Sequence, residues 1–110
     1  MRWFGRLSRS GEIAFVRRRG CALHLATVAA YASESARAPV HVAVTVSKSV
    51  GGAVVRNRVR RRIRGALEAL PAPAQPVRLV FVAKPAAAVA RYALVKRDIA
   101  RALDRLLPEG

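Results

Sequence analysis

Apolar and polar positions alternate in parts of the chain, and this pattern marks candidate strands. In residues 40–46 valines recur at every second position and share one face, which predicts a half-buried strand. Residues 77–83 are apolar on both faces, as expected of a central or parallel strand. Residues 21–31 favour a further strand, although their alanines weaken the pattern. The polar stretch 33–39 then predicts a hairpin loop.

Three other stretches carry apolar residues at helical spacing. The first predicted helix begins at Ser10, whose hydroxyl can cap it, and ends at Gly20. The second begins near residues 52–53 and ends before Pro71, because proline cannot continue a helix. Residues 86–107 predict the third. The order of elements is therefore helix, two or three strands, helix, strand, helix, which indicates an α+β fold with one sheet.

The second predicted helix carries the most informative pattern in the chain. Six arginines fall within residues 56–64, and no acid lies among them to relieve their repulsion. At about 100° per residue, the apolar residues of this helix share a sector of roughly 120°. They are Val55, Val59, Ile63, Ala66, Leu67 and Leu70. We expect this sector to pack on the core while the opposite, arginine-rich side faces a polyanion.

Composition narrows the possible partners. The 110 residues suit one domain, 1–110, whose basic residues 1–9 we expect to form a loosely ordered arm. Lys and Arg number 21 against six acids, a net charge of +15, so nucleic acid is the first candidate partner and an acidic membrane surface the second. Cys21 is the only cysteine, which excludes an internal disulfide and a multi-cysteine zinc site. With no signal-peptide pattern and no apolar run long enough to cross a bilayer, we expect a cytoplasmic protein.

The chain shows no arrangement of residues typical of a nuclease active site. Protein-based phosphodiester hydrolysis commonly uses clustered carboxylates that hold metal ions, or a pair of histidines. The six acids are scattered, and both histidines, His24 and His41, lie in predicted strands. We therefore predict no catalytic residue and no metal ligand in the protein. Three alternatives stay open: a protein that only coats nucleic acid, a self-sufficient nuclease, and a membrane-surface binder.

Residues 46–64 read V-S-K-S-V-G-G-A-V-V-R-N-R-V-R-R-R-I-R and resemble the signature of the protein subunit of bacterial ribonuclease P. The spacing of Ile13, Val16 and Gly20, and the run at 83–86, follow the order that this family shows. The resemblance implies the family's αβββαβα arrangement with a four-stranded sheet, like the second domain of ribosomal protein S5. It also implies a left-handed βαβ crossover through the arginine-rich helix, where general topology rules favour a right-handed one.

The same resemblance implies an activity in which the protein does no chemistry of its own. The family removes the 5′ leader of precursor tRNA, with catalysis by an RNA subunit and its magnesium ions. The protein binds that RNA and the leader; no small-molecule substrate, protein-bound cofactor or membrane is expected. Arginine suits phosphate because it stays charged and can donate two parallel hydrogen bonds. The residues expected to bind the catalytic RNA are Lys48, Arg56, Asn57, Arg58, Arg60, Arg61 and Arg64.

The leader is expected to cross the sheet beside the first helix, on Ile13, Phe15 and Arg17. If Gly20 fixes the alignment, Ile13 and Arg17 occupy positions at which the family commonly carries phenylalanine, and Phe15 lies on a different face. We therefore expect a leader site with less base stacking and more electrostatic attraction. For Ile13 and Phe15, packing in the core is an equally open role. Asn57 could order Arg56 and Arg58, or bind a 2′-hydroxyl.

Overall fold

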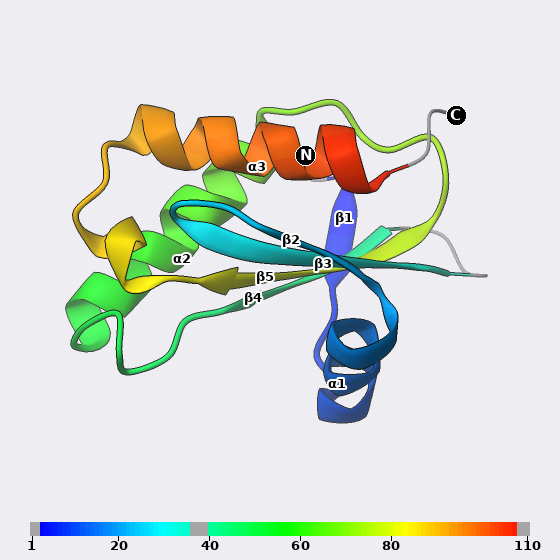
Figure 1. Ribbon diagram of the computed structural model, residues 1–110, viewed down its shortest axis with the longest axis horizontal. Helices are drawn as coiled ribbons and strands as arrows, with labels where there is room; N and C mark the ends of the chain where they lie inside the picture. The colour runs from blue at the N-terminus through cyan, green and yellow to red at the C-terminus, as the bar shows by residue number, and fades with distance from the viewer. Residues whose placement is uncertain (1–2, 36–39, 108–110) are drawn as a thin grey trace.

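The structure, a computed structural model, describes residues 3–35 and 40–107. In this part of the chain, five strands form one mixed sheet in the order β1-β4-β5-β3-β2 (Figure 1). The strands are β1 (Phe4–Arg6), β2 (Cys21–His24), β3 (Val28–Glu34), β4 (Val40–Thr45) and β5 (Val77–Ala83). The helices are α1 (Ser10–Arg19), α2 (Ala53–Glu68), the 3₁₀ helix η1 (Pro85–Ala88) and α3 (Tyr92–Leu106).

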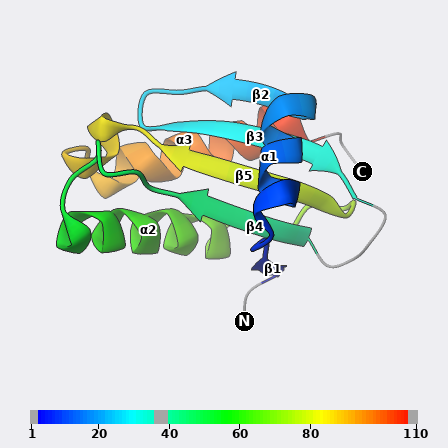
Figure 2. The same cartoon turned by 90° about the horizontal axis from the view of Figure 1, so that it is seen from below.

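The helices cover the two faces of the sheet unequally. Figures 1 and 2 show α2 and α3 on one face and α1 on the other. The larger core lies between the sheet and the α2–α3 pair, and includes the fully buried Phe81, Ile63 and Ile99. A smaller core under α1 contains Val16 and Val80. Because α1 is short, much of this second face is left for side chains that reach solvent.

The arginine-rich helix folds as its pattern predicts. Val59, Ile63 and Leu67 of α2 are buried, and the helix ends before Pro71. β4 and β5 are parallel neighbours joined through α2, so the predicted crossover through this helix is confirmed. Its left-handedness stays a prediction from the family resemblance.

The four-stranded sheet predicted from the resemblance is wrong, because the N-terminal segment adds a fifth strand. Residues 4–6, assigned above to a loosely ordered arm, pair in parallel with β4. Two aromatic residues anchor them. Phe4 is buried in the larger core, and the indole N–H of Trp3 donates to the carbonyls of Leu67 and Leu70 at the end of α2, at 3.1 and 2.9 Å. The observed order is thus αβββαβα preceded by β1.

The hairpin predicted at 33–39 is also wrong. β3 and β4 are not neighbours, because β5 lies between them and pairs with both. Ser33 and Glu34 belong to β3, whereas residues 36–39 lie outside the described part of the chain. The stretch 21–31 splits into β2 and the start of β3, which pair antiparallel.

The third helix begins later than predicted. Residues 85–88 form the 3₁₀ helix η1, and α3 starts only at Tyr92. Ala87 is fully buried, so this turn is part of the core and not a frayed helix end. The carbonyls of Ala88 and Ala90, which lie between the predicted and the observed start of this helix, accept hydrogen bonds from arginines of α2.

Candidate RNA-binding surface

The arginines of α2 divide between two flanks of the helix. On the flank next to η1 and α3, Arg58 Nη2 donates to the carbonyl of Ala88 at 3.0 Å. One turn further, Arg62 Nη1 donates to the carbonyl of Ala90 at 3.3 Å. Both acceptors are neutral carbonyls, so these hydrogen bonds do not neutralise the positive charge of either guanidinium. A guanidinium has five N–H donors, so each keeps others for a ligand.

The opposite flank of α2 borders a groove beside β4 and the start of α1. This groove has a volume of about 550 Å³, and Asn57, Arg60 and Arg64 line it from α2. Arg60 Nη1 donates to Asn57 Oδ1 at 2.9 Å, so Asn57 orders Arg60 and not Arg56 or Arg58. Arg6 of β1 adds a further cation to the lining of the groove. We call this hollow the α2–β4 groove.

Arg56 and Arg61 differ in exposure. Arg61 is exposed on the outer side of α2. Arg56 is half-buried, and its Nε is buried without a hydrogen-bond partner among the described residues. A buried donor left unpaired costs free energy, and a bound acceptor would recover it.

Lys48 lies exposed in the turn that leads into α2. The amide N–H of Gly51 donates to the Lys48 carbonyl at 3.2 Å, and Gly51 has a φ of 154°. A side chain at this position would also collide with Val55, because its Cβ would lie 2.9 Å from Val55 Cγ1. The turn therefore needs glycine. The Gly52 N-cap has no side chain to cap α2, and its first turn holds no acid, so its positive end stays unbalanced.

The residues predicted to bind the leader do not share one environment. Ile13 is half-buried and packs against the smaller core, which supports its packing role. Phe15 is 41% exposed, and the guanidinium of Arg78 lies 5.0 Å from its ring centre. Arg17 lies over the ring of Tyr31, 5.6 Å from its centre. The open part of this face thus presents two arginine–aromatic pairs.

Three residues of these surfaces were not identified from the sequence. Arg6 lies in the predicted N-terminal arm, and Tyr31 lies at the end of the predicted strand 21–31, so the sequence assigns neither of them to a binding surface. Arg78 is the one charged residue within 77–83, and that exception could have drawn attention to it. Arg78 Nη2 is held by Ser33 Oγ and the Glu34 carbonyl, each at 3.3 Å, which fixes the guanidinium beside Phe15.

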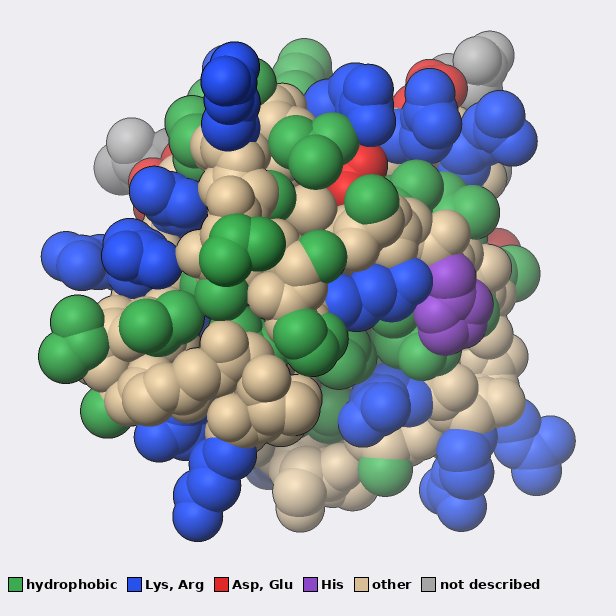
Figure 3. Space-filling view, turned by 60° about the vertical axis from the view of Figure 1, so that its left-hand side comes forward, with side chains coloured by type: hydrophobic (Ala, Val, Ile, Leu, Met, Phe, Trp, Pro, Cys, Tyr) green, Lys and Arg blue, Asp and Glu red, His purple; other side chains and the backbone are tan. Residues whose placement is uncertain are grey.

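These surfaces are rich in cationic side chains and poor in acidic ones. Figure 3 shows Lys and Arg side chains around one face of the molecule, with few Asp or Glu side chains among them. Among residues 3–35 and 40–107, no three His, Cys, Asp or Glu side chains are grouped to hold a metal ion. Asp98 is buried and accepts hydrogen bonds from the backbone N–H and hydroxyl of Thr27, at 3.0 and 2.7 Å.

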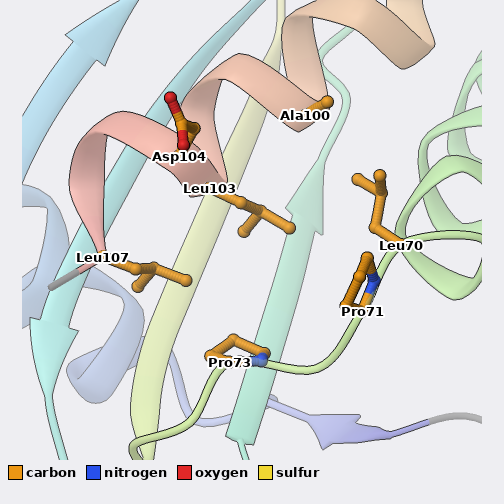
Figure 4. Close-up of a pocket in the computed structure, with 7 residues that line it drawn as sticks. All are labelled: Leu70, Pro71, Pro73, Ala100, Leu103, Asp104 and Leu107. Carbon is orange, nitrogen blue, oxygen red and sulfur yellow. The ribbon is translucent and has the colours of Figure 1, made fainter. Parts of the chain in front are cut away.

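A separate apolar groove lies between α3 and the segment that follows α2 (Figure 4). It has a volume of about 280 Å³ and is lined mainly by leucine and proline side chains, with Asp104 as its one charged residue. It has no basic lining, so it does not suit a polyanion. No helix in the described ranges has the length and apolar character needed to cross a bilayer.

The fold is a mixed α+β sheet with an arginine-rich helix on one face and two arginine–aromatic pairs on the other. This arrangement is typical of proteins with a polyanionic partner. Comparison with known proteins narrows this class. The family model for Ribonuclease P matches residues 1–107, so the chain belongs to the ribonuclease P protein family. It is a protein component of that ribonucleoprotein, an accessory subunit of an endoribonuclease.

Individual relatives agree with this assignment. The chain is 41% identical over 103 residues to the ribonuclease P protein component of Beutenbergia cavernae, covering 92% of this chain and 87% of the relative. It is 40% identical over 105 residues to that of Acidothermus cellulolyticus, with the same coverage. Among solved structures, the Staphylococcus aureus RNase P protein superposes with a TM-score of 0.82 at 16% identity, covering 94% of this chain and 97% of that one. The Thermotoga maritima RNase P protein gives 0.79 at 16% identity, covering 96% and 98%.

Proposed function

We propose that this protein binds the catalytic RNA of ribonuclease P through α2 and the 5′ leader of precursor tRNA through the face that carries α1. It assists removal of the leader in the cytoplasm, while the RNA subunit and its magnesium ions perform the cleavage. One observation carries the proposal: α2 carries six arginines, and the acceptors that Arg58, Arg60 and Arg62 bond within the described residues are all neutral.

The catalytic RNA is held by phosphate contacts from both flanks of α2 and from the turn before it. Arg61 and Arg64 supply their guanidinium groups, and Arg60 supplies the donors that its hydrogen bond to Asn57 leaves available. Lys48 and the unbalanced start of α2 attract a phosphate nearby. Arg56 brings its unpaired Nε, and Arg58 contacts RNA with the donors that Ala88 does not use. Such contacts position the RNA without reading its sequence.

The leader lies on Phe15 and Arg17, with Ile13 supporting α1 from below. A single-stranded segment is recognised by stacking on aromatic rings and by phosphate contacts. Phe15 offers an exposed ring already paired with Arg78, and Arg17 and Tyr31 form a second pair. These pairs join a planar cation to a ring, which favours the mix of stacking and electrostatic attraction expected above.

The proposal is tested by leader cleavage at low magnesium. The purified protein should accelerate cleavage of precursor tRNA by its cognate catalytic RNA, and the RNA-free protein should not cleave. Absence of acceleration would favour a protein that only coats nucleic acid. Cleavage by the RNA-free protein would instead indicate a self-sufficient nuclease.

A further inference from the structure

A second, smaller hollow lies on the flank of α2 that faces α3. It has a volume of about 390 Å³ and is lined by Arg58, Arg61, Arg62 and Tyr92. None of its lining residues also lines the α2–β4 groove, so the two hollows are separate features of the surface. We call it the Tyr92 groove.

The position of Tyr92 is fixed by α2 itself. Arg58 and Arg62 hold the carbonyls of Ala88 and Ala90, just before the residue that starts α3. A Cβ placed on Gly65 would lie 3.6 Å from Tyr92 Oη, so the phenol lies across α2 and reaches as far as Gly65. The ring is nevertheless 40% exposed. It is therefore an aromatic surface held in place beside three guanidinium groups.

Exposed apolar side chains also occur in the segments that border this groove. Among the described residues, the large hydrophobic side chains classed as exposed are Phe15, Val54, Val89 and Tyr92. Val54 lies one turn before Arg58 on α2, and Val89 follows the carbonyl that Arg58 bonds. Tyr92 lines the groove, Val54 and Val89 are near neighbours in the chain of residues that border it, and α1 carries the fourth side chain. A surface that only met duplex phosphates would gain nothing from exposed apolar groups.

We propose that the Tyr92 groove binds one unpaired nucleotide of the catalytic RNA. The base stacks on the exposed face of Tyr92, and Arg58 and Arg61 hold the adjoining phosphates. A base can stack on a protein ring only when it has left its own helix, so the occupant is a bulged or loop nucleotide. This inference rests on the proposed function, since it assigns a second contact to the same RNA.

The test measures the affinity of the full-length protein for its catalytic RNA at several salt concentrations. Tyr92→Leu removes the ring and should weaken binding by about 5- to 150-fold, the range typical of one stacked base. Because the ring is uncharged, the salt dependence should not change. Tyr92→Phe keeps the ring and should bind within about twofold of the wild type. Arg61→Ala should instead reduce the slope of log affinity against log salt by about 1.

His24, an exposed ring on β2 that none of the proposed RNA contacts uses, provides the control. His24→Leu should leave affinity for the catalytic RNA unchanged. Wild-type affinity in Tyr92→Leu would overturn the inference, as would equal losses in Tyr92→Leu and Tyr92→Phe. Failure of the wild-type protein to bind the RNA would overturn the proposed function itself.

A second readout covers the case in which Tyr92→Leu disturbs the fold. In Tyr92→Trp, emission from the new indole should be quenched when RNA is added, beyond any change seen in the wild type, whose only tryptophan is Trp3. Additional quenching supports stacking at this position. No additional quenching in a protein that binds RNA would refute it.

Discussion

Two double substitutions on α2 separate arginines that bond the segment before α3 from arginines that do not. Arg58→Ala with Arg62→Ala removes two guanidinium groups that bond carbonyls of the segment before α3. Arg61→Ala with Arg64→Ala removes two from the same helix that make no such bond. Each variant lowers the net charge from +15 to +13, so the two are matched in charge, helix and substituted residue.

The magnitudes follow from those contacts. A hydrogen bond in a partly solvated site contributes about 0.5 to 1 kcal/mol, so the Arg58/Arg62 variant should lose about 1 to 2 kcal/mol of unfolding free energy. For a domain of this size, that lowers the melting temperature by about 5 °C or more. The Arg61/Arg64 variant should stay within about 0.5 kcal/mol of the wild type.

Binding to the catalytic RNA should weaken in both variants. Loss of the two phosphate contacts assigned to Arg61 and Arg64 reduces the slope of log affinity against log salt by about 1.5, whereas loss of the one assigned to Arg58 reduces it by about 0.8. Thermal denaturation and RNA titrations at several salt concentrations measure the two effects separately. Equal losses of stability in the two variants, or an unchanged salt slope in the Arg61/Arg64 variant, would refute the division of the helix into these two sets.

Three further predictions concern the frame of the fold and the leader site. A methyl group on Gly20 would lie 2.5 and 2.6 Å from two backbone oxygens, so Gly20→Ala should destabilise the protein by about 1 to 3 kcal/mol. Gly11→Ala adds its methyl group in open space on α1, so its free energy of unfolding should be unchanged or slightly higher. Urea titration measures the free energy of unfolding of both variants. Asp98→Ala leaves the two buried donors of Thr27 without an acceptor and should cost about 3 kcal/mol in that titration; a loss below 1 kcal/mol would contradict the role assigned to this contact. Phe15→Leu should reduce the preference of the holoenzyme for precursor tRNA with a leader over mature tRNA, without changing affinity for the catalytic RNA; an unchanged preference would leave Phe15 outside the leader site.

Local signals were enough to predict the elements that bury a long apolar face. α2 followed from helical spacing and from the proline after it, and 77–83 from its apolar residues on both faces. β1 could not be predicted in this way. It has only three residues, and its position depends on contacts between Trp3 and the end of α2, more than sixty residues away.

The errors in strand pairing also have a tertiary cause. Strands that are adjacent in sequence usually pair with each other. Here β5 lies between β3 and β4 and pairs with one edge of each, so these two strands are not neighbours. The break between β2 and β3 depends on distant residues as well. Lys84 Nζ bonds the Leu25 carbonyl, and Asp98 bonds Thr27, so partners from the second half of the chain fix this turn.

For the candidate surface, the sequence predicts which types of residue are present, but it does not predict which of them form hydrogen bonds with one another or with the rest of the protein. The arginine cluster is evident in the sequence, and in the structure Arg58 and Arg61 are exposed while Arg56, Arg60, Arg62 and Arg64 are half-buried. Which arginines bond the protein depends on where the segment before α3 passes, and no local pattern reports that path. The same reason explains why Asn57 was expected beside Arg56 and Arg58 but bonds Arg60.

The position of β5 has a consequence for how the protein is made. It is the central strand of the sheet and also the last strand in the described part of the chain. During synthesis the growing chain can form only two separate ribbons, β1 with β4 and β2 with β3, until residues 77–83 leave the ribosome. The arginine helix has by then already emerged, so the cell holds a strongly cationic and incomplete protein in the presence of abundant RNA. Early capture of that helix by its own ribozyme would let assembly begin before the polypeptide is finished.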